Sequence, residues 1–162
     1  MTMNVLTWLI AIPLLGFATG LRTMTPMAVL CWFSYLGFLP VHHSWAVWTT
    51  KLVTAIVFTV LALGEYIGDK LPKTPARVSP APLVARIFFA GMVGAIAANG
   101  LKGSETEGVI LAVLGGLIGA FGGYLVRRDL VQYFQCKDWH IAVPEDVIAV
   151  CCAVFAMGVI TG

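Results

Sequence analysis

The sequence predicts an all-α membrane protein, a polytopic bundle of six transmembrane helices, and three observations lead to this fold class. Of its 162 residues, 59% are hydrophobic and only 11% are charged, whereas soluble domains carry about a quarter charged residues. Six apolar runs approach the roughly 20 residues that a helix needs to cross a bilayer. The connections between them are short, so residues 1–162 are expected to form a single transmembrane domain.

The six predicted spans follow one another closely. The second is the weakest, because its strongly apolar part, from Met27 to Val41, is shorter than a full span. The alternative is five spans plus one re-entrant segment, which a bilayer tolerates only where protein surrounds the irregular backbone. The runs cover residues 5–21, 25–41, 46–67, 81–100, 109–127 and 145–161.

The positions of Lys and Arg predict the orientation, because basic residues concentrate in cytoplasmic loops. In the six-span arrangement only Lys51 and Lys102 lie on one side. The other eight of the ten basic residues lie on the opposite side, which is therefore expected to be cytoplasmic, with both termini outside; they are Arg22, Lys70, Lys73, Arg77, Arg86, Arg127, Arg128 and Lys137.

Alternate spans end in a Gly-x-x-x-Gly pattern followed by basic residues and then by a proline that begins the next predicted helix. This repetition predicts three similar helical hairpins, although plain helix packing also explains the glycines. In either case we expect the glycine faces to be buried against other helices or subunits, and the protein to form a homo-oligomer. The pairs are Gly16 and Gly20, Gly64 and Gly68, and Gly119 and Gly123.

The charged residues around the third and fourth spans predict an interaction inside the bundle. Glu65 and Asp69 are four residues apart and share one helix face. Arg86 lies one to two turns inside the next helix, where an isolated cation is costly. Either carboxylate is its expected partner. Glu145 and Asp146 are predicted in the first turn of the last helix, near the same side of the membrane.

Two predicted helix starts, Thr25-Pro26 and Ser79-Pro80, each follow an arginine by two or three residues. A hydroxyl at the N-cap before a proline is a common helix start, and helix N-termini attract anions. The sequence therefore predicts an anion receptor. The candidate binding residues are Arg22, Thr25, Glu65, Asp69, Lys70, Arg77, Ser79, Arg86, Arg127 and Glu145.

Three blocks of the sequence carry a resemblance to a known family. They are residues 16–26, the more specific block 64–86 with its Gly-Glu-x-x-Gly-Asp-Lys-x-Pro start, and residues 115–127. The chain resembles a family of small bacterial inner-membrane proteins described only as a domain of unknown function. The resemblance implies a multi-pass protein of the bacterial inner membrane, and it implies no activity or catalytic residues.

Several classes of function are disfavoured. The basic residues are too few and too scattered for a nucleic-acid-binding protein. No nucleophile with a base, cofactor motif or metal-ligand set is evident, so we expect no enzyme, no cofactor and no metal. His42 and His43 are predicted on the opposite side of the membrane from His140. Glu65 and Asp69 lie beside several cations, which favours an ion-pair network over a Mg²⁺ site for a lipid diphosphate.

The predicted function is that of a small oligomeric membrane transporter or channel-like protein. It would handle an anionic solute or the phosphate of a lipid headgroup at the cytoplasmic-side charged cluster. The alternative is a non-transporting membrane scaffold or assembly factor, in which the charges only hold helices together. The expected partners are membrane lipid, a small anion and further copies of the chain.

The orientation can be tested by labelling single cysteines in a cysteine-free variant. Cysteines placed within residues 70–78 should react only from the cytoplasm, and cysteines near either terminus only from outside, because of the positive-inside bias. Reaction of residues 70–78 from outside, or termini on opposite faces, would contradict the six-span arrangement.

Overall fold

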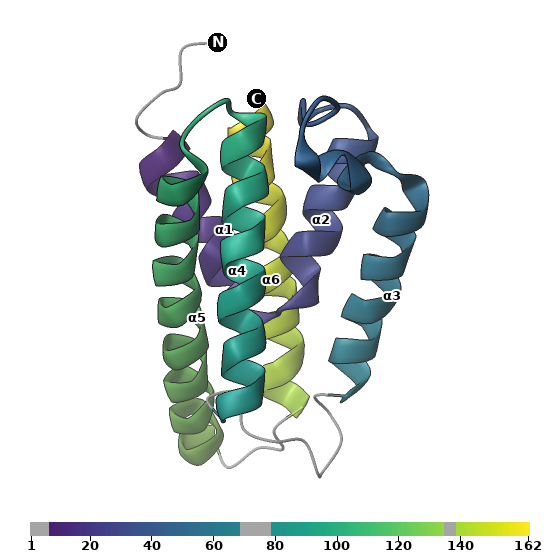
Figure 1. Ribbon diagram of the computed structural model, residues 1–162. Coiled ribbons are helices and arrows are strands. Elements are labelled where there is room, and N and C mark those ends of the chain that lie inside the picture. The colour runs from purple at the N-terminus through teal and green to yellow at the C-terminus, as the bar shows by residue number, and fades with distance from the viewer. Residues whose placement is uncertain (1–6, 69–78, 135–138) are drawn as a thin grey trace.

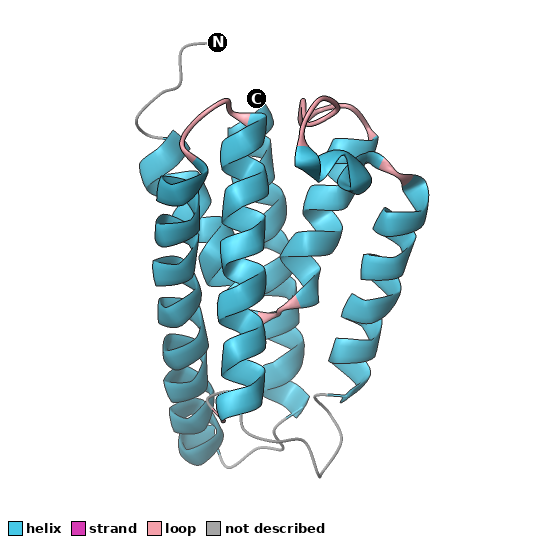
Figure 2. Ribbon diagram, in the orientation of Figure 1, coloured by secondary structure: helices cyan, strands magenta, loops and turns pink. Residues whose placement is uncertain are grey.

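The computed structural model describes residues 7–68, 79–134 and 139–162. All regular secondary structure in these residues is helical (Figures 1 and 2). In chain order the elements are a π-helical turn η1 (Thr7–Ala11), α1 (Ile12–Leu21), α2 (Met24–Tyr35), a 3-10 helix η2 (Trp45–Thr50), α3 (Leu52–Gly68), α4 (Pro80–Gly100), α5 (Glu105–Phe134) and α6 (Trp139–Thr161).

The helices form a bundle in which α3 to α6 run along its length, while α1 and α2 form a short hairpin. The purple element η1 and the C-terminus lie at the upper end of Figure 1. From there α1 descends, and α2 returns after a turn that lies part-way along the bundle. At 1.5 Å per residue, the 10 residues of α1 and the 12 of α2 measure about 15 and 18 Å, short of a hydrocarbon core of about 30 Å.

This hairpin differs from the two full spans expected over residues 5–21 and 25–41. Helix α2 ends at Tyr35, and Gly37 takes a left-handed conformation with φ of 82°, which ends a helix without the steric cost that a side chain would add. Leu39 and Val41 then fold back into the core instead of continuing the span. A re-entrant segment was expected only as an alternative and only in residues 25–41, whereas α1 and α2 share the reversal.

The other helices correspond to predicted runs with shifted ends. The run 81–100 matches α4, and the run 109–127 lies inside the longer α5. The run 46–67 is interrupted at Lys51, which separates η2 from α3. The start predicted for the last helix is wrong, because α6 begins at Trp139 and contains Pro144.

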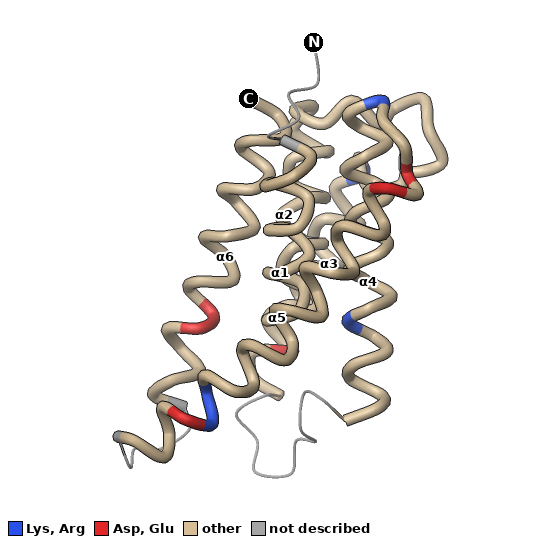
Figure 3. Tube along the Cα trace, turned by 90° about the vertical axis from the view of Figure 1, so that its left-hand side faces the viewer, with Lys and Arg blue, Asp and Glu red and all other residues tan. Residues whose placement is uncertain are grey.

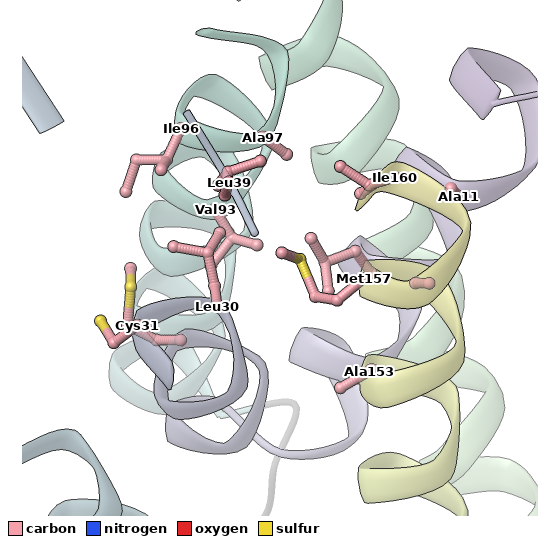
Figure 4. Close-up of a cluster of buried hydrophobic side chains, with 14 of the residues drawn as sticks. Ala11, Leu30, Cys31, Leu39, Val93, Ile96, Ala97, Ala153, Met157 and Ile160 are labelled. Carbon is pink, nitrogen blue, oxygen red and sulfur yellow. The ribbon is translucent and has the colours of Figure 1, made fainter. Parts of the chain in front are cut away.

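The core lies where the hairpin meets α4 and α6. Helix α1 is enclosed by α4, α5 and α6, and seven of its ten residues are buried. Leu30 of α2 and Leu39 of the following loop pack beside Val93 and Ile96 of α4, and Met157 of α6 points toward them (Figure 4). All five side chains are at most 1% exposed. The hairpin therefore fills the upper half of the bundle.

Glycines bring α1 and α5 together backbone to backbone. A Cβ atom at Gly16 would overlap the backbone of Ala112, and one at Gly20 would overlap the backbone of Gly116, Gly119 and Ala120. Gly119 on α5 faces the backbone of Phe17 in the same way. Small residues allow this close approach between membrane helices. The expected burial of the first Gly-x-x-x-Gly pair is therefore confirmed.

The second glycine pair lies in different surroundings. Within the described part of the chain, nothing lies within 4 Å of a Cβ atom added at Gly64 or Gly68. Helix α3 packs mainly on α2, and much of its surface is apolar and exposed, including Val53, Val60 and Ile67. The described residues therefore do not bury this glycine face, and its expected burial stays a prediction.

The two glycine environments predict opposite effects of alanine. Gly20→Ala should lower the free energy of unfolding by about 1–3 kcal/mol or more, because the added methyl group overlaps the backbone of α5. Gly64→Ala should be neutral or raise it by up to about 1 kcal/mol, because alanine favours the helix and meets no neighbour. Thermal unfolding of both variants in detergent measures the difference.

The state of assembly provides a separate readout of the α3 face. Gly68→Leu should reduce the size of the assembly in detergent if this face packs against a second copy.

For the alanine variants, equal stability of the parent, Gly20→Ala and Gly64→Ala would contradict the close packing of α1 on α5.

Candidate functional site

The candidate site is built around the turn between α1 and α2. Only Arg22 and Thr23 separate the two helices, and Arg22 has an extended backbone with φ of −140° and ψ of 116°. Its side chain is completely buried and is the largest fully buried side chain in the described structure. A buried guanidinium requires compensating negative charge and hydrogen bonds. The turn therefore defines where acidic side chains must gather.

Asp146 of α6 provides that charge. The Nε atom of Arg22 donates a hydrogen bond to Oδ1 of Asp146 at 2.6 Å, and Nη2 contacts the same oxygen. The guanidinium also lies over the ring of Tyr66, 5.4 Å from its centroid, which is cation–π geometry. The hydroxyl groups of Tyr66 and Thr25 are hydrogen-bonded at 2.6 Å. Side chains from three helices thus hold the turn.

Glu65 of α3 binds the backbone at the start of α2. The N–H groups of Thr23 and Met24 donate to Oε1 and Oε2 of Glu65, each at 2.9 Å. The first four N–H positions of a helix lack partners within the helix. Here Pro26 has no N–H at one of these positions, and Glu65 accepts from two others. A carboxylate also complements the positive end of the helix dipole.

Arg86 approaches the same carboxylate from α4. Its Nη2 atom lies 3.8 Å from Oε1 of Glu65, and the two side chains are 7% and 18% exposed. Of the two carboxylates predicted as partners of Arg86, Glu65 is therefore present as one, and Asp69 lies outside the described residues. Glu65 thus contacts both the backbone of α2 and a guanidinium of α4.

A third pair extends the cluster toward α5. Nη1 of Arg127 lies 3.7 Å from Oε2 of Glu145, with side chains 13% and 10% exposed. Glu145 precedes Asp146 on α6, so the Arg127 and Arg22 pairs are neighbours. Figure 3 shows charged positions of α4, α5 and α6 in the lower half of the bundle. We call the three pairs the charged cluster: Arg22 with Asp146, Glu65 with Arg86, and Arg127 with Glu145.

The structure gathers six of the ten predicted site residues: Arg22, Thr25, Glu65, Arg86, Arg127 and Glu145. Ser79 occupies the N-cap of α4 as expected, but lies seven residues before Arg86, about 10 Å along a helix. Asp69, Lys70 and Arg77 lie outside the described residues.

Two details of the prediction are wrong. Thr25 is not the N-cap of α2, because that position is Thr23, and the hydroxyl of Thr25 bonds to Tyr66 instead. Glu145 and Asp146 are not in the first turn of α6, because the helix begins at Trp139. Tyr66 and Asp146 are missing from the predicted set; their proximity in sequence to Glu65 and Glu145 was the available signal.

The described residues give no indication of a metal centre. Within residues 7–68, 79–134 and 139–162, no three His, Cys, Asp or Glu side chains gather as metal ligands would. In the charged cluster, guanidinium and backbone N–H groups bind carboxylates of the chain through hydrogen bonds and ion pairs.

The structure defines a class of protein. Three helices, over Pro80–Gly100, Glu105–Tyr133 and His140–Thr161, are long and apolar enough to cross a membrane, and Trp8–Leu21 and Leu52–Gly68 are shorter apolar helices. Large apolar side chains such as Val53, Ile118 and Phe155 are exposed, as expected for surfaces that face lipid. These features indicate a multi-pass helical membrane protein.

Comparison with known families identifies the group more closely. Residues 9–159 match the model of the domain of unknown function DUF4126, so the chain belongs to this family. This confirms the resemblance seen in the sequence. Neither the comparison with curated proteins nor that with solved structures gave a match.

Loss of the buried ion pair between Arg22 and Asp146 should lower the free energy of unfolding far more than loss of an exposed ion pair. Arg22→Met or Asp146→Asn should each lower the free energy of unfolding by about 3–5 kcal/mol, because each leaves a poorly solvated charge. The double variant should recover much of this loss. Arg128→Gln, which removes an exposed pair with Asp129, should change stability by at most about 1 kcal/mol.

A double-mutant cycle from thermal or denaturant unfolding in detergent provides the measurement. Additive losses at Arg22 and Asp146, with no recovery in the double variant, would contradict a direct coupling between the two side chains.

Proposed function

We propose that the protein is a small oligomeric transporter or channel-like protein of the bacterial inner membrane. Its ligand is an anionic solute or the phosphate of a lipid headgroup, which contacts the charged cluster. The observation that carries this proposal is the completely buried Arg22 at the turn of a hairpin that ends part-way along the bundle.

General properties of membrane proteins support this interpretation. Irregular backbone at membrane depth occurs where protein surrounds it or where it lines a water-filled cavity. Transporters place their substrate sites at interrupted helices, whose N-termini point toward anionic groups. The start of α2 has this arrangement, with two backbone N–H groups bound to a carboxylate beside Arg86.

The proposed topology combines the six-run pattern with the short hairpin. Helices α3 to α6 cross the membrane, and α1 and α2 enter together from outside and return. Both termini then lie outside, and the connections that carry Lys70, Lys73, Arg77 and Lys137 lie in the cytoplasm, in agreement with the positive-inside bias. The charged cluster lies between the turn of the hairpin and the cytoplasmic end.

The exposed face of α3 supports assembly into a homo-oligomer. Gly64 and Gly68 leave this face without bulk at two adjacent turns, and small residues promote close contacts between membrane helices. A second copy is therefore the partner we propose for α3.

A non-transporting scaffold is the second candidate, and the pairing of charges favours it specifically. The charged cluster contains three arginines and three carboxylates in three pairs. Such a set holds α1, α3, α4, α5 and α6 in register without any ligand. The two functions differ in whether the cluster binds an added anion or lipid.

Reconstituted vesicles distinguish the two candidates. Purified protein in phosphatidylcholine vesicles, with or without phosphatidylglycerol, is assayed for flux of chloride, formate and phosphate and for binding of phosphatidylglycerol. Arg86→Met should reduce flux or binding by about tenfold or more, which corresponds to a loss of about 1.4 kcal/mol, because the guanidinium beside Glu65 is removed. Lys51→Met, an exposed cation at the opposite end, is the matched control.

The paired variants complete the test. Glu65→Gln, Asp69→Asn and their combinations with Arg86→Met separate stability from ligand binding. If Arg86→Met with Glu65→Gln restores stability and binds every anion or lipid that the parent binds, or if the parent moves no probe, transport through the charged cluster is refuted and the scaffold remains.

A further inference from the structure

We propose that Glu65 is a tethered anion: its carboxylate, attached to the protein, occupies the binding site of the anionic ligand. When its side chain withdraws, a small carboxylate or a monoanion of similar size binds the N–H groups of Thr23 and Met24 beside Arg86. This inference rests on the proposed function and deepens it, because it assigns the chemical class of the ligand and makes Glu65 the group that regulates access.

The hydrogen bonds of Glu65 show what the place accepts. Each oxygen of the carboxylate accepts one backbone N–H at 2.9 Å, so the group is bound through both oxygens. It comes from a different helix, more than 40 residues away in the chain, and is not a local cap within α2. The start of α2 therefore already binds a carboxylate, which α3 of the same chain supplies.

Two buried arginines lie beside these backbone donors. Arg86, 7% exposed, lies 3.8 Å from the same Oε1 atom that accepts the N–H of Thr23. Arg22, completely buried, precedes Thr23 and is bound to Asp146. An incoming carboxylate that replaces Glu65 finds two backbone donors and the guanidinium of Arg86 in one place, while Asp146 continues to neutralise Arg22.

The position of α3 allows Glu65 to withdraw. The residue lies one turn before the end of α3 at Gly68, and its side chain is 18% exposed. Nothing in the described chain crowds a Cβ atom at the neighbouring Gly64. Toward α4, the ring of Phe58 lies 6.4 Å from that of Phe89. A rotamer change of Glu65 alone therefore leaves the α1–α5 contact and the contacts of Tyr66 with Arg22 and Thr25 in place.

Chemical rescue tests the proposal directly. Glu65→Ala should be less stable than the parent, and sodium formate should raise its melting temperature saturably, by about 3–6 °C at about ten times the dissociation constant. The parent should show no saturable rise, because its own carboxylate fills the place. Sodium gluconate at equal ionic strength is the salt control, since the larger anion does not fit a place filled by one carboxylate.

Two variants make the rescue specific. Glu107→Ala removes an exposed carboxylate at the opposite end of the bundle and should respond to formate as the parent does. Glu65→Ala combined with Arg86→Met should lose the formate response or require at least tenfold more formate. If Glu65→Ala does not fold, Glu65→Asp, one methylene shorter, should raise formate or chloride flux in vesicles about tenfold over the parent.

The outcomes separate this inference from the proposed function. If no Glu65 variant responds to formate or moves anions faster than the parent, the tethered anion is refuted; Arg86-dependent flux in the parent then still supports transport. Formate rescue of Glu65→Ala without flux in any protein supports the tethered anion and refutes transport. A rise with phosphatidylglycerol but not with formate overturns the assignment of a small soluble anion.

Discussion

A polypeptide that reverses direction inside an apolar bundle must satisfy its freed backbone groups with protein, because lipid offers them no partners. The turn after α1 imposes this constraint on its neighbours. Glu65 accepts the N–H groups that α2 leaves open, and Arg86 approaches the carboxylate in turn. Asp146 and Tyr66 surround the guanidinium that the turn carries inward. The charged cluster is thus a consequence of where the chain turns.

The glycine contacts between α1 and α5 determine how deeply this turn is buried inside the bundle. Because Gly16 and Gly20 meet the backbone of α5 directly, α1 lies deep enough for Arg22 to reach α6 on one side while the start of α2 meets α3 on the other. A larger residue at either position would separate α1 from α5 and lengthen these contacts. The apolar helix contact and the polar cluster are therefore coupled through one short helix.

Sequence patterns predicted the long helices and part of the site, since both depend on local composition. The apolar run 81–100 gave α4 almost residue for residue, and hairpin adjacency predicted that Arg86 would pair with Glu65 or Asp69, of which the structure shows Glu65. The turn at Arg22 falls between the predicted runs 5–21 and 25–41, but its position part-way along the bundle was not predicted, because it depends on contacts with α3, α5 and α6, which no local pattern reports. The start of α6 was missed for a related reason: a proline inside a helix resembles one that begins it.

The contact of α1 with α5 also has a consequence for the order of events during synthesis. Gly16 packs on Ala112, which is 96 residues later in the chain, and at 5–20 residues per second the ribosome needs about 5–20 s to produce this partner. Asp146 follows later still. Until then Arg22 lacks the carboxylate that neutralises it in the finished bundle, so the first hairpin cannot take its final position before α5 and α6 have been synthesised.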